Sequence, residues 1–79
     1  SKLSDLQAAV VEVVYDHGND GWVSHVEIAN QIGNKVGVKP RNSSVARALD
    51  RLQKHKQELE MDVRRRSDDN LVWEAKCLA

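Results

Sequence analysis

Apolar residues recur at helical spacing near the start of the chain. Ser4 precedes this pattern and Gln7 follows three residues later, which is the sequence signature of a capping box. Gly18 interrupts the pattern directly after His17 and predicts the end of the helix. The apolar positions that share one helical face are Leu6, Ala9, Val10, Val13 and Val14.

A second helix is predicted to begin after Ser24. Ser24 and Glu27 form another capping-box pair, and Gly37 ends the segment. The two residues before it, Trp22-Val23, are too few for an independent strand, but they are able to add an edge to a sheet formed elsewhere. The apolar stripe of this second helix is Ile28, Ala29, Ile32 and Val36.

Pro40 forces Lys39 toward extended geometry and separates a third helix from the second. We expect Asn42 or Ser43 to cap this helix, which covers residues 43–55 and has about twelve residues. Its inward face consists of Val45, Ala48, Leu49 and Leu52. Its outward face consists of Ser44, Arg47, Arg51 and Lys54.

The period then changes from 3.6 to 2, which predicts a β-hairpin over residues 59–75. Residues 67–70 are of types that are favoured in turns, so we expect a four-residue turn there. The positions that alternate onto the apolar face are Leu59, Met61, Val63, Leu71, Trp73 and Ala75. For the whole chain we expect a core of Leu6, Val10, Val13, Ile28, Ile32, Val45, Leu49, Leu52, Val63 and Trp73.

The predicted order is helix, short strand, helix, helix and two-stranded hairpin. This mainly α arrangement with a small β-hairpin is that of the winged helix-turn-helix, in which the third helix takes the recognition position and the hairpin is the wing. We expect residues 1–79 to form one such domain, cut from a longer protein. Trp22 and Trp73 are expected to be core aromatics that cover the small sheet.

The bulk composition excludes several classes of protein. A chain of 79 residues buries roughly 60% of its unfolded surface, so its core is small and a deep catalytic pocket is not expected. His17, His25, His55 and Cys77 lack metal-ligand spacing, and nothing suggests a nucleophile, a cofactor or a small-molecule substrate. A single cysteine and the absence of a run of about 18 apolar residues favour an intracellular protein, cytoplasmic or nuclear, without a membrane span.

Charge is unevenly distributed although the chain is neutral overall. Residues 35–66 contain ten Lys and Arg against four acids, a net charge of +6. Residues 1–34 have a net charge of −4, from one cation and five acids. Residues 67–79 have a net charge of −2, from one cation and three acids. A basic segment on an otherwise acidic body is what a phosphate-facing surface requires.

The candidate contact residues lie in the third helix and the hairpin. Alternation sends Arg65 to the face opposite Arg64 and Arg66, so these three do not form one patch on a flat hairpin. Asp68 and Asp69 at the predicted tip disfavour a close approach of phosphates there. The expected nucleic-acid-binding residues are Arg41, Asn42, Ser44, Arg47, Arg51, Lys54, Arg64, Arg65 and Arg66.

Several short motifs resemble the LOTUS domain, also called OST-HTH, a family of winged helices. They are Gly21-Trp22-Val23 before the second helix, the basic link Val38-Lys39-Pro40-Arg41, the leucine pair in Ala48-Leu49-Asp50-Arg51-Leu52, and the ending 58–66. LOTUS domains are linked to RNA binding or RNA–protein assembly, and in bacteria they often accompany a nuclease-like domain. The resemblance therefore implies an RNA-binding module attached to such a domain.

Three kinds of partner follow from these observations. A non-catalytic module that binds nucleic acid is the leading hypothesis, with DNA favoured and RNA second. An acidic protein is the alternative, because dedicated DNA-binding domains are usually basic overall and this chain has zero net charge.

Overall fold

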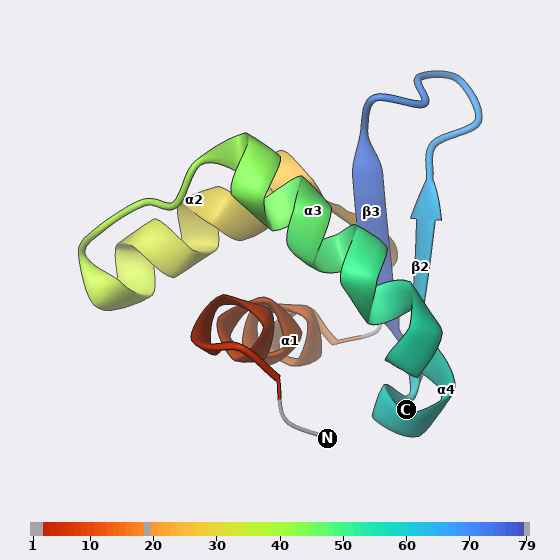
Figure 1. Cartoon of the computed structure of the whole chain (residues 1–79), viewed down its shortest axis with the longest axis horizontal. Helices are drawn as coiled ribbons and strands as arrows, with labels where there is room; N and C mark the ends of the chain where they lie inside the picture. The colour runs from red at the N-terminus through yellow and green to blue at the C-terminus, as the bar shows by residue number, and fades with distance from the viewer. Residues whose placement is uncertain (1–2, 19, 79) are drawn as a thin grey trace.

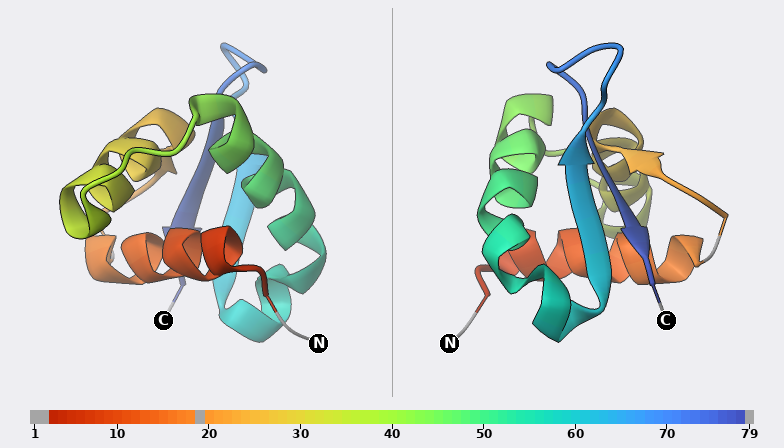
Figure 2. Two further views of the ribbon diagram at one scale, coloured as in Figure 1. Left: turned by 60° about the vertical axis from the view of Figure 1, so that its left-hand side comes forward. Right: turned by 90° about the vertical axis from the view of Figure 1, so that its right-hand side faces the viewer.

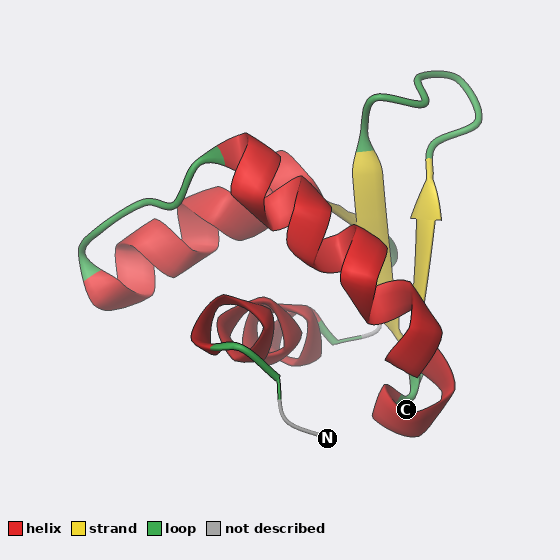
Figure 3. Cartoon of the chain, in the orientation of Figure 1, coloured by secondary structure: helices red, strands yellow, loops and turns green. Residues whose placement is uncertain are grey.

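The computed structural model describes residues 3–18 and 20–78. The fold is mainly helical with a small antiparallel sheet, as predicted (Figure 1, Figure 3). A short fourth helix, which the sequence pattern did not indicate, follows the third. The elements in order are α1 (Asp5–His17), β1 (Val23–Ser24), α2 (His25–Val36), α3 (Asn42–Leu52), the 3₁₀ turn η1 (Gln53–His55), α4 (Lys56–Leu59), β2 (Met61–Arg65) and β3 (Trp73–Cys77).

The predicted capping box of α1 is present. Ser4 Oγ accepts from the Gln7 amide at 3.1 Å, and the Ser4 amide donates to Gln7 Oε1 at 3.0 Å. Gly18 follows the helix with a φ of +66°, which an L side chain rarely adopts. The first helix therefore begins and ends where its polar residues predict.

The second helix confirms its predicted start and end but only half of its capping box. Ser24 Oγ accepts from the Glu27 amide at 3.2 Å, while the Glu27 carboxylate accepts from Gln31 Nε2 at 3.0 Å. Gly37 is left-handed, with a φ of +85°. The expectation that Val36 joins the apolar face is wrong: the last turn of α2 extends past α3, and Val36 is 65% exposed (Figure 1).

The predicted cap of the third helix is also wrong. Asn42 is the first helical residue of α3, and Arg41 takes the N-cap position. The Asn42 side chain instead accepts a hydrogen bond from Lys39 Nζ at 3.0 Å. The regular α-helix has eleven residues and ends at Leu52, after which η1 and α4 continue the chain in short turns.

The first strand of the hairpin starts two residues later than predicted, because Leu59 belongs to α4. Glu60 then adopts a left-handed conformation with a φ of +55° and turns the chain into β2. Two tertiary hydrogen bonds hold this turn: Tyr15 Oη donates to the Leu59 carbonyl at 2.5 Å, and the Leu78 amide donates to the Glu60 carbonyl at 2.8 Å. Both partners are distant in sequence, so local alternation does not reveal them.

The three strands form an antiparallel sheet in the order β1-β3-β2. Val23 pairs with Ala75, and Ala75 pairs with Val63. This confirms that the segment around Trp22-Val23 hydrogen-bonds to the hairpin, although the strand itself is Val23–Ser24. In the right-hand view of Figure 2 the strands of the hairpin lie in front of the helices, so the sheet has one face toward the core and one outer face.

The loop of the hairpin is longer than the predicted Ser67–Asn70 turn. The Arg66 amide donates to the Val72 carbonyl at 2.9 Å and closes a wider loop. Within it the Leu71 amide donates to Asp69 Oδ1 at 3.1 Å, which delays the start of β3 until Trp73. Leu71 is therefore 81% exposed, and its expected place on the apolar face of the strand is wrong.

Nine of the ten predicted core residues are buried. Leu6 is the exception: it lies in the first turn of α1 and is half-buried at the edge of the core. Val11 is buried although it lies outside the predicted stripe, because α1 packs against α2, α3 and β3 and so uses a wider face. The buried residues of the core are completed by Val14, Val23, Ala29, Ala48, Met61 and Ala75.

Candidate nucleic-acid interface

The exposed side of α3 has the composition that the sequence predicts. Val45, Ala48, Leu49 and Leu52 face the core, so the residues between them face solvent. Arg47, Arg51 and Lys54 are exposed, and Ser44 is half-buried beside them. We call Arg47, Arg51 and Lys54 the α3 cation row, although Lys54 lies in η1, two residues past the end of α3, and not in the predicted longer helix.

The α3 cation row is not neutralised by neighbouring acids. Within residues 3–18 and 20–78, no ion pair of 4.0 Å or less includes Arg47, Arg51 or Lys54. The same holds there for Arg41, which is exposed at the N-cap. Exposed cations without a carboxylate partner keep their full attraction for an incoming anion.

A groove runs between α3 and the first turn of α1. Its volume is about 270 Å³, and Leu6 and Ala48 add apolar surface to an otherwise polar lining. The residues that line it are Ser4, Leu6, Gln7, Ser44, Arg47, Ala48 and Arg51. Two members of the α3 cation row therefore border a concave surface.

The arginines of the hairpin are placed differently. Glu74, whose whole residue is 5% exposed, accepts from Arg64 Nε at 2.7 Å and lies 3.4 Å from Arg66 Nε. Arg66 Nε is also 3.9 Å from Asp68. Arg65 lies on the other face of the hairpin, 5.0 Å from the centre of the Trp73 ring. The predicted separation of Arg65 from Arg64 and Arg66 is confirmed.

Trp22 corrects another expectation. Val23 enters the core, so the preceding side chain points to the outer face of the sheet. Trp22 is half-buried there, and its ring lies 3.8 Å from the Arg64 guanidinium carbon and 4.9 Å from Lys76 Nζ. Trp73, 9% exposed, is the core aromatic that the sequence predicts. We call Trp22, Arg64, Arg66, Glu74 and Lys76 the Glu74 cluster.

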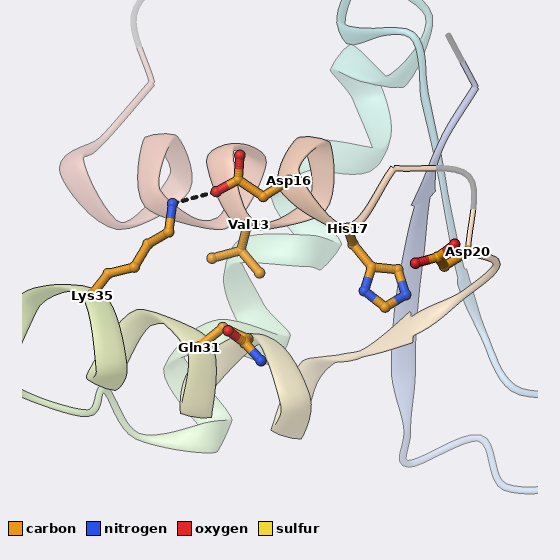
Figure 4. Close-up of a pocket in the computed structure, with 6 residues that line it drawn as sticks. All are labelled: Val13, Asp16, His17, Asp20, Gln31 and Lys35. Carbon is orange, nitrogen blue, oxygen red and sulfur yellow. Dashed lines mark hydrogen bonds and ion pairs between the residues drawn. The ribbon is translucent and has the colours of Figure 1, made fainter.

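Lys35 belongs to the basic segment by sequence, but it neutralises the acidic half. Its ammonium group donates to Asp16 (Figure 4) and also, at 3.2 Å, to Glu12. These two hydrogen bonds raise the pKa of Lys35 above its ordinary value. The hollow beside this pair lies between α1 and α2 and is lined by Val13, Asp16, His17, Asp20, Gln31 and Lys35.

The residues that the structure describes contain no cluster of three or more His, Cys, Asp or Glu suited to a metal ion. Among the same residues, no helix is long and apolar enough to cross a membrane.

Comparison with known proteins gives no further information on the candidate interface. No protein-family model, curated protein or solved structure matches this chain.

Proposed function

We propose that this chain is a winged-helix module that binds nucleic acid without catalysing a reaction. The order helix, strand, helix, helix, hairpin and the sheet order β1-β3-β2 support the winged-helix assignment. In this fold α3 is the recognition helix and the β2–β3 hairpin is the wing.

The observation that carries the proposal is the α3 cation row. Arg47 and Arg51 are exposed on α3, Lys54 is exposed in η1 directly after it, and none of the three forms an ion pair within the described residues. Phosphate oxygens are the anions that such a row suits, and Arg also binds guanine edges through two hydrogen bonds. Arg41, Asn42 and Ser44 are donors for a phosphate at the start of the same helix.

Duplex DNA is the favoured ligand, because an α-helix with an exposed basic face fits the width of the DNA major groove. An RNA helix has a major groove too narrow for side chains to read, so α3 would meet RNA mainly through phosphates. RNA is the second ligand, and it is the one that the LOTUS-like motifs imply.

The test is the salt dependence of binding to an arbitrary duplex of DNA, compared with RNA of the same sequence. If Arg47 and Arg51 each neutralise one phosphate, Arg47→Ala and Arg51→Ala each lower the log–log salt slope by about 0.9. Arg64→Ala is the matched control, since Arg64 is bound by Glu74. We expect the control to change the slope by less than half as much.

A second candidate function is docking of an acidic protein segment. The groove between α1 and α3 favours it, because Leu6 and Ala48 add apolar surface beside Arg47 and Arg51. This alternative predicts no binding of DNA or RNA even at low ionic strength, where electrostatic attraction is strongest. If the folded protein binds neither DNA nor RNA in such a titration, protein docking replaces our proposal.

A further inference from the structure

Trp22 is a large aromatic residue that the core does not use. The described residues that form or border the core cluster do not include it, although they include Trp73. It lies on the outer face of the sheet, which in Figure 2 is the side turned away from the helices. An aromatic ring on a free sheet face is available to a flat ligand.

The ring is already part of an ordered stack. Arg64 lies 3.8 Å from its centre, and the bond from Arg64 Nε to Glu74 Oε2, 2.7 Å long, fixes the guanidinium. Glu74 is 5% exposed, whereas the Arg64 side chain is 53% exposed. The anchor of the stack is therefore buried while the cation over the ring remains open to solvent.

The charge around Trp22 favours an anion. The Glu74 cluster holds three cations and one acid; Asp62 lies across the strands from Lys76 but pairs with Lys56 at 3.5 Å, and within the described residues no ion pair includes Lys76. Asp68 approaches Arg66 at 3.9 Å, but its side chain is 78% exposed and hence well screened by water. Two adjoining hollows share Trp22, Arg66 and Glu74; the first also reaches Glu27, and the second also reaches Arg64 and Asp68.

We infer that the outer face of the sheet is a second site, which binds single-stranded nucleic acid. An unpaired base stacks on the Trp22–Arg64 pair, and the flanking phosphates meet Lys76 and Arg66. Aromatic residues interleaved with cations are the usual platform for single strands, because every base has a flat face. A duplex keeps its bases stacked inside and does not satisfy this site.

Trp22 fluorescence gives a direct readout. In a Trp73→Phe variant Trp22 is the only tryptophan. We expect a thymidine homopolymer to quench its emission in a saturable way, and a duplex at equal nucleotide concentration to quench it much less. Equal quenching by both would overturn the inference, because it would mean that no unpaired base is required.

Affinity measurements separate this site from α3. We expect Trp22→Leu to weaken binding of a labelled thymidine homopolymer about tenfold, the effect of losing one stacked base, with duplex affinity unchanged. Lys76→Gln is a second variant, which keeps the Trp22–Arg64 stack and tests the site even where Trp22→Leu fails to fold. We expect it to weaken single-strand binding several-fold.

Arg47→Ala supplies the opposite control, since it acts on the proposed duplex site alone. Loss of homopolymer binding in Arg47→Ala with no loss in Trp22→Leu or Lys76→Gln would mean that α3 binds both nucleic acids and that the Glu74 cluster only braces the hairpin. Homopolymer quenching without any duplex affinity would overturn the proposed duplex site on α3 and leave this inference standing. Stronger quenching by a polyglutamate peptide than by the homopolymer would assign the face to protein docking.

Discussion

The α3 helix and the β2–β3 hairpin carry similar numbers of cations but use them in opposite ways. Along α3 and η1, Arg47, Arg51 and Lys54 form no ion pair of 4.0 Å or less within the described chain. On the hairpin, Arg64 and Arg66 share the buried carboxylate of Glu74. A run of basic residues in the sequence therefore does not predict a phosphate surface until the partners of each residue are known.

The difference arises from the geometry of the two elements. Side chains on the outer face of a helix meet only their own neighbours three and four residues away. Side chains on a sheet also meet the opposite strand, and here the register sets Arg64 directly across from Glu74. The hairpin thus pairs two of its cations with Glu74, whereas Asp50, three residues after Arg47 on α3, forms no ion pair of 4.0 Å or less within the described residues.

The largest expected effect tests the inner side of α3. Leu49 is fully buried, so Leu49→Ala should lower the free energy of unfolding by about 2–5 kcal/mol, through lost burial and the cavity left behind. Urea denaturation measures it. Arg47→Ala, on the outer side of the same helix, should change stability by less than about 0.5 kcal/mol. A loss below that value for Leu49→Ala would mean that the helix is rotated from its assigned phase.

Glu74→Gln should have the next largest effect. It removes the buried charge that accepts from Arg64 and faces Arg66, and hydrogen bonds to charged groups contribute about 1.5–3 kcal/mol each. We expect a loss of unfolding free energy in that range and, because both arginines are freed, a steeper salt slope for duplex binding. Glu58→Gln is the control, since its carboxylate is 80% exposed. An unchanged stability would show that Glu74 does not anchor the hairpin.

Arg64 and Arg65 form a matched pair for a smaller effect. Arg64→Ala removes both the bond to Glu74 and the contact with Trp22, whereas Arg65→Ala removes only a contact with Trp73 at 5.0 Å. Exposed cation–π contacts contribute about 0.5–1 kcal/mol. Thermal unfolding should therefore show a loss of about 1.5 kcal/mol for Arg64→Ala, at the low end of the range for a bond to a charged group because Arg66 still faces Glu74, and a smaller loss for Arg65→Ala. The reverse order would contradict the assigned partners.

Replacement of Lys35 should have the smallest effect on the free energy of unfolding. Asp16 and Glu12 raise the pKa of Lys35, so the folded state favours the charged form. The resulting stabilisation is fully present below the ordinary lysine pKa and disappears as the pH rises through the higher folded-state value. The stability difference between wild type and Lys35→Met should accordingly be slight at neutral pH and fall toward zero in strong alkali. A difference that grows with pH would have the wrong sign.

Residues a few positions apart define the helix ends and the inward faces of this protein. Ser4, Gln7, Ser24 and the glycines Gly18 and Gly37 mark the ends of α1 and α2, because capping and left-handed geometry depend on residues a few positions apart. Periodicity likewise assigned the inward face of α3 and the alternation of Arg64, Arg65 and Arg66.

The partners of the polar groups, in contrast, depend on contacts between segments that are distant in the sequence. The turn at Glu60 depends on Tyr15 and Leu78, the pairing of Arg64 depends on the register with Glu74, and the place of Trp22 depends on the face at which β1 joins the sheet. The physical reason is that a strand exposes two equivalent faces. Which one is buried, and what lies across from each residue, depend on segments that are distant in the chain.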